Sequence, residues 1–133
     1  MFEVSDNSVI GFYARDARPS KALNVTFWIL QFLTAAAFLI AGATKLAGAE
    51  VHVATFEKIG VGQWFRYFTG GLEVICAILI LLPKTTAPAA TVLGVTMVGA
   101  IALHLLVIGG SPIPAIVLLV ITAAVAKYRT LYE

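Results

Sequence analysis

The stretch from Thr85 to Ala126 contains no aspartate, glutamate, lysine or arginine. Hydrophobic residues make up 60% of the 133-residue chain and charged residues only 12%, whereas soluble domains average about 45–50% apolar and about 25% charged residues. A water-soluble fold of this length leaves too much of its surface exposed to hide so many apolar side chains. The composition therefore predicts an integral membrane protein whose main partner is the lipid bilayer.

Four apolar segments follow one another, over residues 23–46, 66–82, 87–108 and 112–128. A helix needs about 20 residues to cross roughly 30 Å of hydrocarbon, and helices are expected because lipid offers backbone groups no hydrogen-bonding partner. The second and fourth segments are slightly short, which helix tilt accommodates. Short turns with proline or glycine separate the last three segments, so neighbouring helices run antiparallel. The sequence thus predicts an all-α fold, an antiparallel four-helix transmembrane bundle.

The connection between the first two segments, residues 47–65, is longer and of mixed polarity. Phe56 and Ile59 are three residues apart, as on one side of a helix, and Gly60 and Gly62 are suitable stops. We therefore expect a short amphipathic helix that lies at the membrane interface or folds back as a re-entrant segment.

Lysine and arginine are distributed unevenly between the two ends of the predicted bundle. Six of the nine belong to the two tails and to the turn between the second and third segments. Cytoplasmic flanks are enriched in these residues, so both termini are predicted to lie in the cytoplasm, with the chain in the inner or plasma membrane. The expected organisation is a polar cytoplasmic tail over residues 1–22, a membrane domain over 23–128 and a short cytoplasmic tail over 129–133.

The residues of the chain also exclude several chemistries. Cys76 is the only cysteine, so the chain has no internal disulfide, Cys-x-x-Cys redox pair or cysteine zinc site. One glutamate and one histidine within the apolar segments fall short of a usual metal ligand set. No phosphate-binding loop, catalytic triad or dinucleotide fingerprint occurs. The net charge of +2, without a basic run, argues against a nucleic-acid partner.

Glu73 is the one carboxylate inside the apolar stretch from Tyr67 to Pro83. A charge in hydrocarbon costs at least roughly 2.5–3.5 kcal/mol, so an acidic residue retained there usually has a partner and a function. The antiparallel topology brings Glu73 to the same height as Lys45, at the end of the first segment, and His104, near the end of the third. We therefore predict a polar intramembrane site with a Lys45–Glu73 ion pair and with His104 close by.

Helical spacing assigns further residues to the inner faces that carry these three side chains. Small and polar residues on such faces let helices approach closely in lipid. The predicted lining residues are Gln31, Thr34, Phe38, Thr69, Cys76 and Met97. Structural roles stay open beside the functional ones: Lys45 as a snorkelling anchor, His104 as a hydrogen-bonded interior residue and Cys76 as a small packing residue.

A set of short motifs is spread over residues 27–126: the run Phe38–Leu46 (FLIAGATKL), Phe56 and Gly60 in the connection, Gly71-Leu72-Glu73 ahead of Leu81-Leu82-Pro83, and His104. With a proline-containing start to the fourth segment, this set resembles the DoxX and DoxX-like families. The resemblance implies a four-helix membrane protein in which Lys45 and Glu73 match the family's intramembrane polar positions. Relatives include subunits tied to thiosulfate:quinone oxidoreduction and membrane partners of sulfurtransferase and superoxide-detoxifying proteins. Distant eukaryotic relatives assist receptor assembly.

Three functions follow as hypotheses, and the sequence alone names neither a reaction nor a catalytic residue. The first is an accessory subunit of a membrane-associated oxidoreductase system, acting in sulfur or quinone metabolism or in oxidative stress, with a quinone near Glu73 and His104. The second is a non-catalytic assembly or scaffolding protein that docks other membrane proteins through residues 47–65. The third is a small proton-coupled transporter. Association with further copies of the chain stays open.

Overall fold

The computed structural model describes residues 20–132, and within this range the chain is entirely helical. The elements in chain order are α2 (Lys21–Ala47), α3 (Glu50–Ile59), α4 (Trp64–Leu79), α5 (Thr86–Leu103), the π-helix η1 (His104–Ile108) and α6 (Ile113–Tyr132). The predicted all-α class is confirmed, including a short helix between the first two long ones. The expected cytoplasmic tail over residues 1–22 lies almost wholly outside the described residues.

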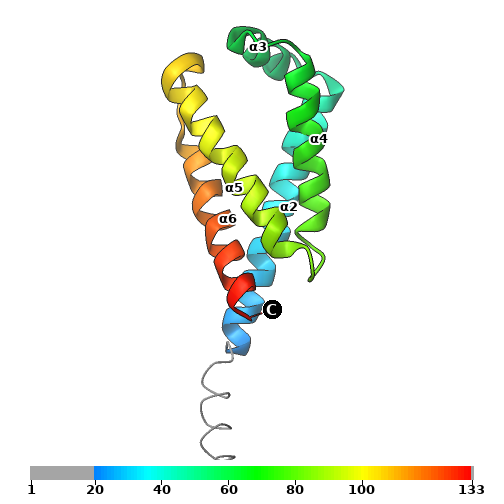
Figure 1. Ribbon diagram of the computed structural model, residues 1–133, viewed down its shortest axis with the longest axis vertical. Coiled ribbons are helices and arrows are strands. Elements are labelled where there is room, and N and C mark those ends of the chain that lie inside the picture. The colour runs from blue at the N-terminus through cyan, green and yellow to red at the C-terminus, as the bar shows by residue number, and fades with distance from the viewer. Residues whose placement is uncertain (1–19, 133) are drawn as a thin grey trace, which may run out of the picture.

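The long helices form two antiparallel pairs, α2 with α4 and α5 with α6, and these two pairings are the most extensive in the molecule. The pairs meet at the end where α6 terminates and diverge toward the opposite end (Figure 1). There α3 lies across the gap between them and contacts α2, α4 and η1. The fold is thus a wedge of two helix pairs. The pairs are separated at the wide end, and α3 covers the space between them there.

Helix boundaries follow from individual residues. The Ser20 side chain accepts a hydrogen bond from the Leu23 amide at 3.1 Å and so caps the start of α2. Gly48, with φ of 77°, ends α2 in a left-handed conformation that favours glycine, and Gly60, with φ of 82°, ends α3 in the same way. Two bounds differ from expectation by more than two residues. Helix α4 ends at Leu79, before the expected residue 82, and the chain continues in turns. Helix α6 continues to Tyr132, beyond the expected end at residue 128.

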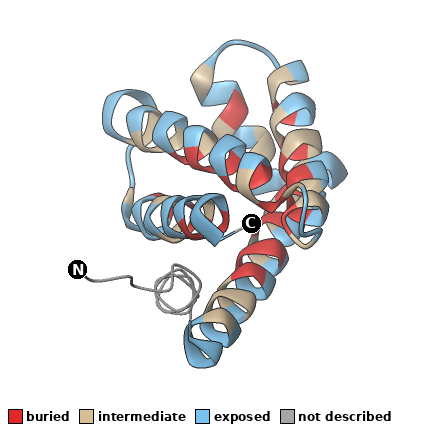
Figure 2. Ribbon diagram, turned by 60° about the horizontal axis from the view of Figure 1, so that its bottom comes forward, coloured by how far each residue is buried: buried red, intermediate tan, exposed pale blue. Residues whose placement is uncertain are grey.

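Burial is restricted to the sides of the helices that face one another, while their outer sides are exposed (Figure 2). Large apolar side chains lie on these outer sides; Ile40, Val95 and Leu106 are 65%, 67% and 82% exposed. Such an apolar exterior is stable only in contact with lipid. The chain is accordingly a multi-pass membrane protein.

Three of the described helices are long and apolar enough to cross a membrane: α2, the continuous segment Thr86–Ile108 and α6. Helix α4 has 16 residues, about 24 Å at roughly 1.5 Å per residue, and falls short of the roughly 30 Å hydrocarbon core. The structure therefore supports three candidate spans, where the sequence predicted four.

The close approach of α2 and α4 depends on two glycines. A Cβ atom added at Gly42 would lie 2.6 Å from the Gly70 carbonyl oxygen and 2.7 Å from Val74 Cγ2. A Cβ at Gly70 would lie 2.9 Å from Lys45 Cβ. The two backbones meet because neither position carries a side chain. This contact places the last turn of α2 directly against the centre of α4.

Candidate functional site

The structure contains the predicted ion pair between α2 and α4. Lys45 Nζ donates hydrogen bonds to both carboxylate oxygens of Glu73, at 2.8 and 2.9 Å. Glu73 is only 1% exposed, so its charge is shielded by the bundle from surrounding lipid. A buried pair of this kind holds two helices in register, and removing one partner leaves the other charge uncompensated.

Arg66, in the first turn of α4, fixes the backbone from which Lys45 extends. Its Nη1 donates to the Lys45 carbonyl oxygen, its Nε donates to Gln63 Oε1 at 2.7 Å, and its guanidinium lies 4.3 Å from the Tyr67 ring centroid. A cation at the carboxyl end of a helix interacts favourably with the negative end of the helix dipole. In the sequence Arg66 is recognisable only as the first residue of the second apolar segment, because its buried position depends on the tertiary packing of α2 against α4.

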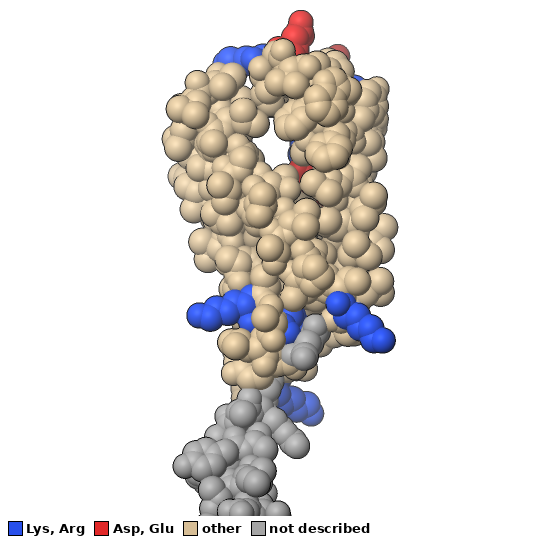
Figure 3. Space-filling view, in the orientation of Figure 1, with Lys and Arg blue, Asp and Glu red and all other residues tan. Residues whose placement is uncertain are grey.

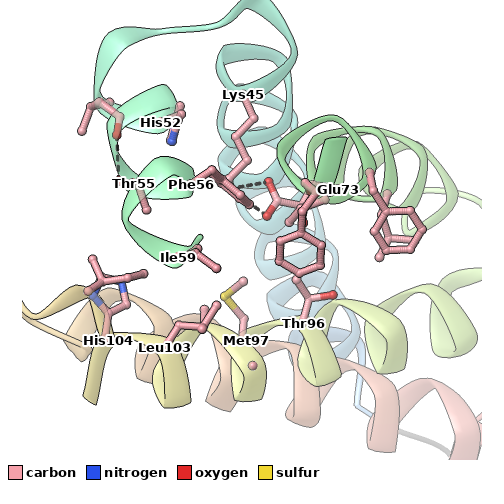
Figure 4. Close-up of a pocket in the computed structure, with 18 residues that line it drawn as sticks. Lys45, His52, Thr55, Phe56, Ile59, Glu73, Thr96, Met97, Leu103 and His104 are labelled. Carbon is pink, nitrogen blue, oxygen red and sulfur yellow. Dashed lines mark hydrogen bonds and ion pairs between the residues drawn. The ribbon is translucent and has the colours of Figure 1, made fainter. Parts of the chain in front are cut away.

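A cavity of about 420 Å³ lies beneath α3, between the α2–α4 pair and the wall formed by α5 and η1. Figure 4 shows the Lys45–Glu73 pair on one side of this cavity, with Met97, Leu103 and His104 across from it. In Figure 3 the molecule is hollowed through at this level, with an acidic group at the edge of the opening. Ligand pockets typically measure about 300–1,000 Å³ and combine apolar walls with a few polar groups, and this cavity has both properties.

His104 lines the cavity from the opposite wall and does not bond to the ion pair. Its Nδ1 lies 2.9 Å from the Gly109 carbonyl oxygen, and the Gly109 amide in turn donates to the His104 carbonyl at 3.0 Å. His104 is the first residue of the π-helix η1, a geometry often found at functional sites. The two walls thus bring separate hydrogen-bonding groups to a single cavity.

Helix α3 forms the roof of the cavity and is tied to both walls. Lys58 Nζ donates to the Ile108 carbonyl oxygen of η1 at 2.8 Å, and Gln63 Nε2 donates to the Val53 carbonyl oxygen at 3.0 Å. On its inner side Phe56, 5% exposed, packs against Phe65 of α4 with ring centroids 5.7 Å apart. The helix expected to lie at the interface or to fold back thus folds over the bundle and closes the wide end.

His52 attaches the first turn of α3 to α2. Its Nε2 lies 3.0 Å from Thr44 Oγ1, while the Thr44 hydroxyl donates to the Ile40 carbonyl oxygen at 2.8 Å. With the hydroxyl proton engaged there, we assign the His52 Nε2–H as the donor to Thr44. Burial, with the positive charges of Lys45 and Arg66, lowers the pKa of His52 below its ordinary value near 6.5.

This lowered pKa predicts a pH-dependent attachment of the roof. The unfolded chain takes up the His52 proton more readily than the folded protein, so the contribution of neutral His52 is complete above about pH 6.5 and is lost as pH falls below it. We expect the melting temperature to decline less between neutral and mildly acidic pH in His52→Gln than in the wild type. Identical pH profiles for the two proteins would contradict this assignment.

The remaining predicted lining residues are divided between different environments. Thr69 and Met97 line the cavity, whereas Phe38 and Cys76 lie in the core between the helices. Gln31 lies near the narrow end, where its Nε2 donates to the Ile80 carbonyl oxygen at 2.9 Å. The buried Thr34 hydroxyl oxygen has no hydrogen-bond partner among the described residues.

The contribution of α3 to the cavity was not predicted from the sequence. The α3 residues that line it are Val51, His52, Thr55, Phe56 and Ile59. The spacing of Phe56 and Ile59 indicated an amphipathic helix, but not the surface against which it packs. Within residues 20–132 no three His, Cys, Asp or Glu side chains gather as a ligand set. The side chains present are suited to bind an apolar molecule with a hydrogen-bonding head.

A family model described as DoxX-like matches residues 29–126. The chain belongs to the DoxX-like family. Searches of curated proteins and of solved structures found no match. The matched range of this DoxX-like protein contains the ion pair, the roof helix and both walls of the cavity. The last residues of α6 lie beyond it.

Proposed function

We propose that this DoxX-like protein binds a membrane-soluble quinone in the cavity beneath α3 and acts as an accessory subunit of a membrane oxidoreductase system. The observation that carries the proposal is a buried ion pair at the wall of an otherwise largely apolar cavity. A quinone combines a flat apolar ring and tail with two carbonyl oxygens that accept hydrogen bonds. Its chemistry therefore complements both kinds of surface in this cavity.

The side chains that would contact a quinone have distinct parts to play. Lys45 Nζ has three N–H donors, two of which bond to the Glu73 carboxylate, so its third can donate to a quinone carbonyl oxygen. Phe56 and Met97 provide a surface for the ring, since aromatic and thioether groups pack well on flat π-systems. Reduction of a quinone needs two electrons and two protons. A partner protein supplies the electrons in this proposal, because the chain has a single cysteine and no metal ligand set among its described residues.

We further propose that α4 is a fourth span and that the narrow end of the wedge is cytoplasmic. Helix α4 runs antiparallel to α2 and α5 (Figure 1), and exposed Trp64, Tyr67 and Phe68 at its start suit an aromatic belt at the interface. Tilt and local thinning of the bilayer accommodate its short length. The roof and the cavity would then lie in the outer half of the membrane, accessible to a quinone from that leaflet.

Filling the cavity is expected to abolish quinone binding. Gly99 lines the cavity, and a Cβ atom placed there meets no atom within 4 Å. Gly99→Leu should therefore fold normally while it occupies the ligand volume. We expect its affinity for a radiolabelled short-chain quinone, measured by equilibrium binding in detergent, to fall about tenfold or more, which corresponds to roughly 1.4 kcal/mol or above.

Gly71→Leu is the matched control for this experiment. A Cβ at Gly71 also meets nothing within 4 Å, and the residue does not line the cavity. Both variants gain the same side chain in a helix, so their effects on helix propensity are alike. Equal quinone affinity in wild type and Gly99→Leu, or an absence of binding by the wild type, would refute the proposal.

A further inference from the structure

Arg129 lies buried near the end of α6, at the narrow end of the wedge and far from the cavity. It is 6% exposed. Its Nε donates to Gln31 Oε1 at 2.6 Å and its Nη1 to Asn24 Oδ1 at 3.3 Å. Its guanidinium carbon lies 4.9 Å from the Trp28 ring centroid and 5.2 Å from that of Tyr128. All of these partners are neutral.

One part of this guanidinium has no hydrogen-bond partner. Nη2 is buried and pairs with no atom among the described residues. Arginine stays protonated in proteins, and a buried charge without a counter-charge is strongly unfavourable. The neutral oxygens and aromatic faces around Arg129 orient its charge without neutralising it. The arrangement is therefore that of a site prepared for an anion.

The described charged side chains at the narrow end are also positive, like Arg129. Lys21, Lys84 and Lys127 belong to this end of the molecule, whereas the carboxylates of the described residues, Glu50, Glu57 and Glu73, belong to the roof and the ion pair. On the face drawn in Figure 3, basic side chains of the described residues surround the lower end, and the acidic ones that are visible lie at the opening and at the upper end. Positive charges at a helix end attract the anionic headgroups of a leaflet.

We propose that Arg129, with Asn24, Gln31 and Trp28, forms a binding site for a phosphate group, supplied by the headgroup of an anionic phospholipid. A guanidinium binds phosphate oxygens through its N–H donors, and Nη2 is the part of Arg129 that has no partner among the described residues. Trp28, an aromatic side chain near a span end, suits the interfacial depth of a headgroup. Apart from Gln31, the cluster lies outside the range that the family model matches.

Trp28 provides a direct probe of this site. The chain has two tryptophans, so Trp64→Phe leaves Trp28 as the only one. We would reconstitute this protein in phosphatidylcholine vesicles in which part of the lipid is replaced by brominated phosphatidylglycerol or by brominated phosphatidylcholine. The proposal predicts stronger quenching of Trp28 emission by the brominated anionic lipid, because that lipid resides next to Arg129. Equal quenching by both lipids would overturn it.

Variants separate a specific site from general attraction to anionic lipid. In the same background, Arg129→Gln should abolish the preference, while Arg129→Lys, which keeps the charge, should retain part of it. Lys84→Gln removes an exposed cation from the same end and should leave the preference unchanged. A preference that survives Arg129→Gln, or that Lys84→Gln removes equally, would contradict the assignment. If added inorganic phosphate abolishes the preference for the anionic lipid, the site binds phosphate. In that case a soluble phosphate compound, and not the lipid headgroup, is its occupant.

Discussion

Replacing Lys45 with methionine is expected to lower the free energy of unfolding by about 3–5 kcal/mol. Methionine retains the length and apolar stem of lysine but leaves the Glu73 carboxylate buried without its partner. Glu73 is the more deeply buried member of the pair, with a side chain 2% exposed against 15% for Lys45. Glu73→Gln should therefore cost less, since the glutamine oxygen still accepts from Lys45 Nζ and the ammonium keeps partial access to solvent.

A double-mutant cycle measures this coupling. We expect the double variant Lys45→Met, Glu73→Gln to lose clearly less stability than the two single variants together, in denaturant titrations of the purified protein in detergent. Lys58→Met serves as a control, because Lys58 is an exposed lysine that bonds to a backbone carbonyl and to no carboxylate of residues 20–132. Single effects that add within about 0.3–0.5 kcal/mol would show that the pair carries no coupling.

Gly42→Val should destabilise the protein by about 1–3 kcal/mol through overpacking. The new Cβ would lie 2.6 Å from a backbone oxygen, that of Gly70, and backbone cannot move aside as a flexible side chain can. The helices α2 and α4 must therefore separate, which also lengthens the Lys45–Glu73 contact. The melting temperature in detergent provides the readout.

Gly71→Val controls for the β-branched side chain itself. Gly71 lies in the same helix as Gly70, and a Cβ there meets no atom within 4 Å. We expect its melting temperature to stay close to that of the wild type. If Gly42→Val were as well tolerated as Gly71→Val, the close approach of α2 and α4 would not be a structural requirement.

The ion pair was predictable from sequence because two simple constraints act on it. An acidic residue in an apolar segment needs a partner, and an antiparallel arrangement of successive membrane segments places Lys45 at the height of Glu73. Neither constraint depends on the details of side-chain packing. Hydrophobicity likewise indicated the long helices, although the end of α4 at Leu79 depends on local turn geometry that apolar composition does not reveal.

Other features depend on tertiary packing that the sequence pattern does not encode. Gln31 and Lys45 share a helix face, which led both to be predicted for one site. At roughly 1.5 Å per residue they are about 21 Å apart along the helix, so they lie at opposite ends of the bundle. Arg129 falls in the expected carboxy-terminal tail, whereas the structure turns it inward against Gln31. The roof of the cavity could not be assigned, because mixed polarity suits the interface and a bundle surface equally well.

The most direct test of the central claim, that a quinone occupies the cavity beneath α3, is photolabelling with an azidoquinone in lipid nanodiscs, followed by mass spectrometry. The account predicts adducts on cavity residues such as Thr55, Met97 and Leu103, and their loss in Gly99→Leu. Adducts confined to lipid-facing residues such as Leu33 and Val120, which are 63% exposed, and unchanged in Gly99→Leu, would contradict it.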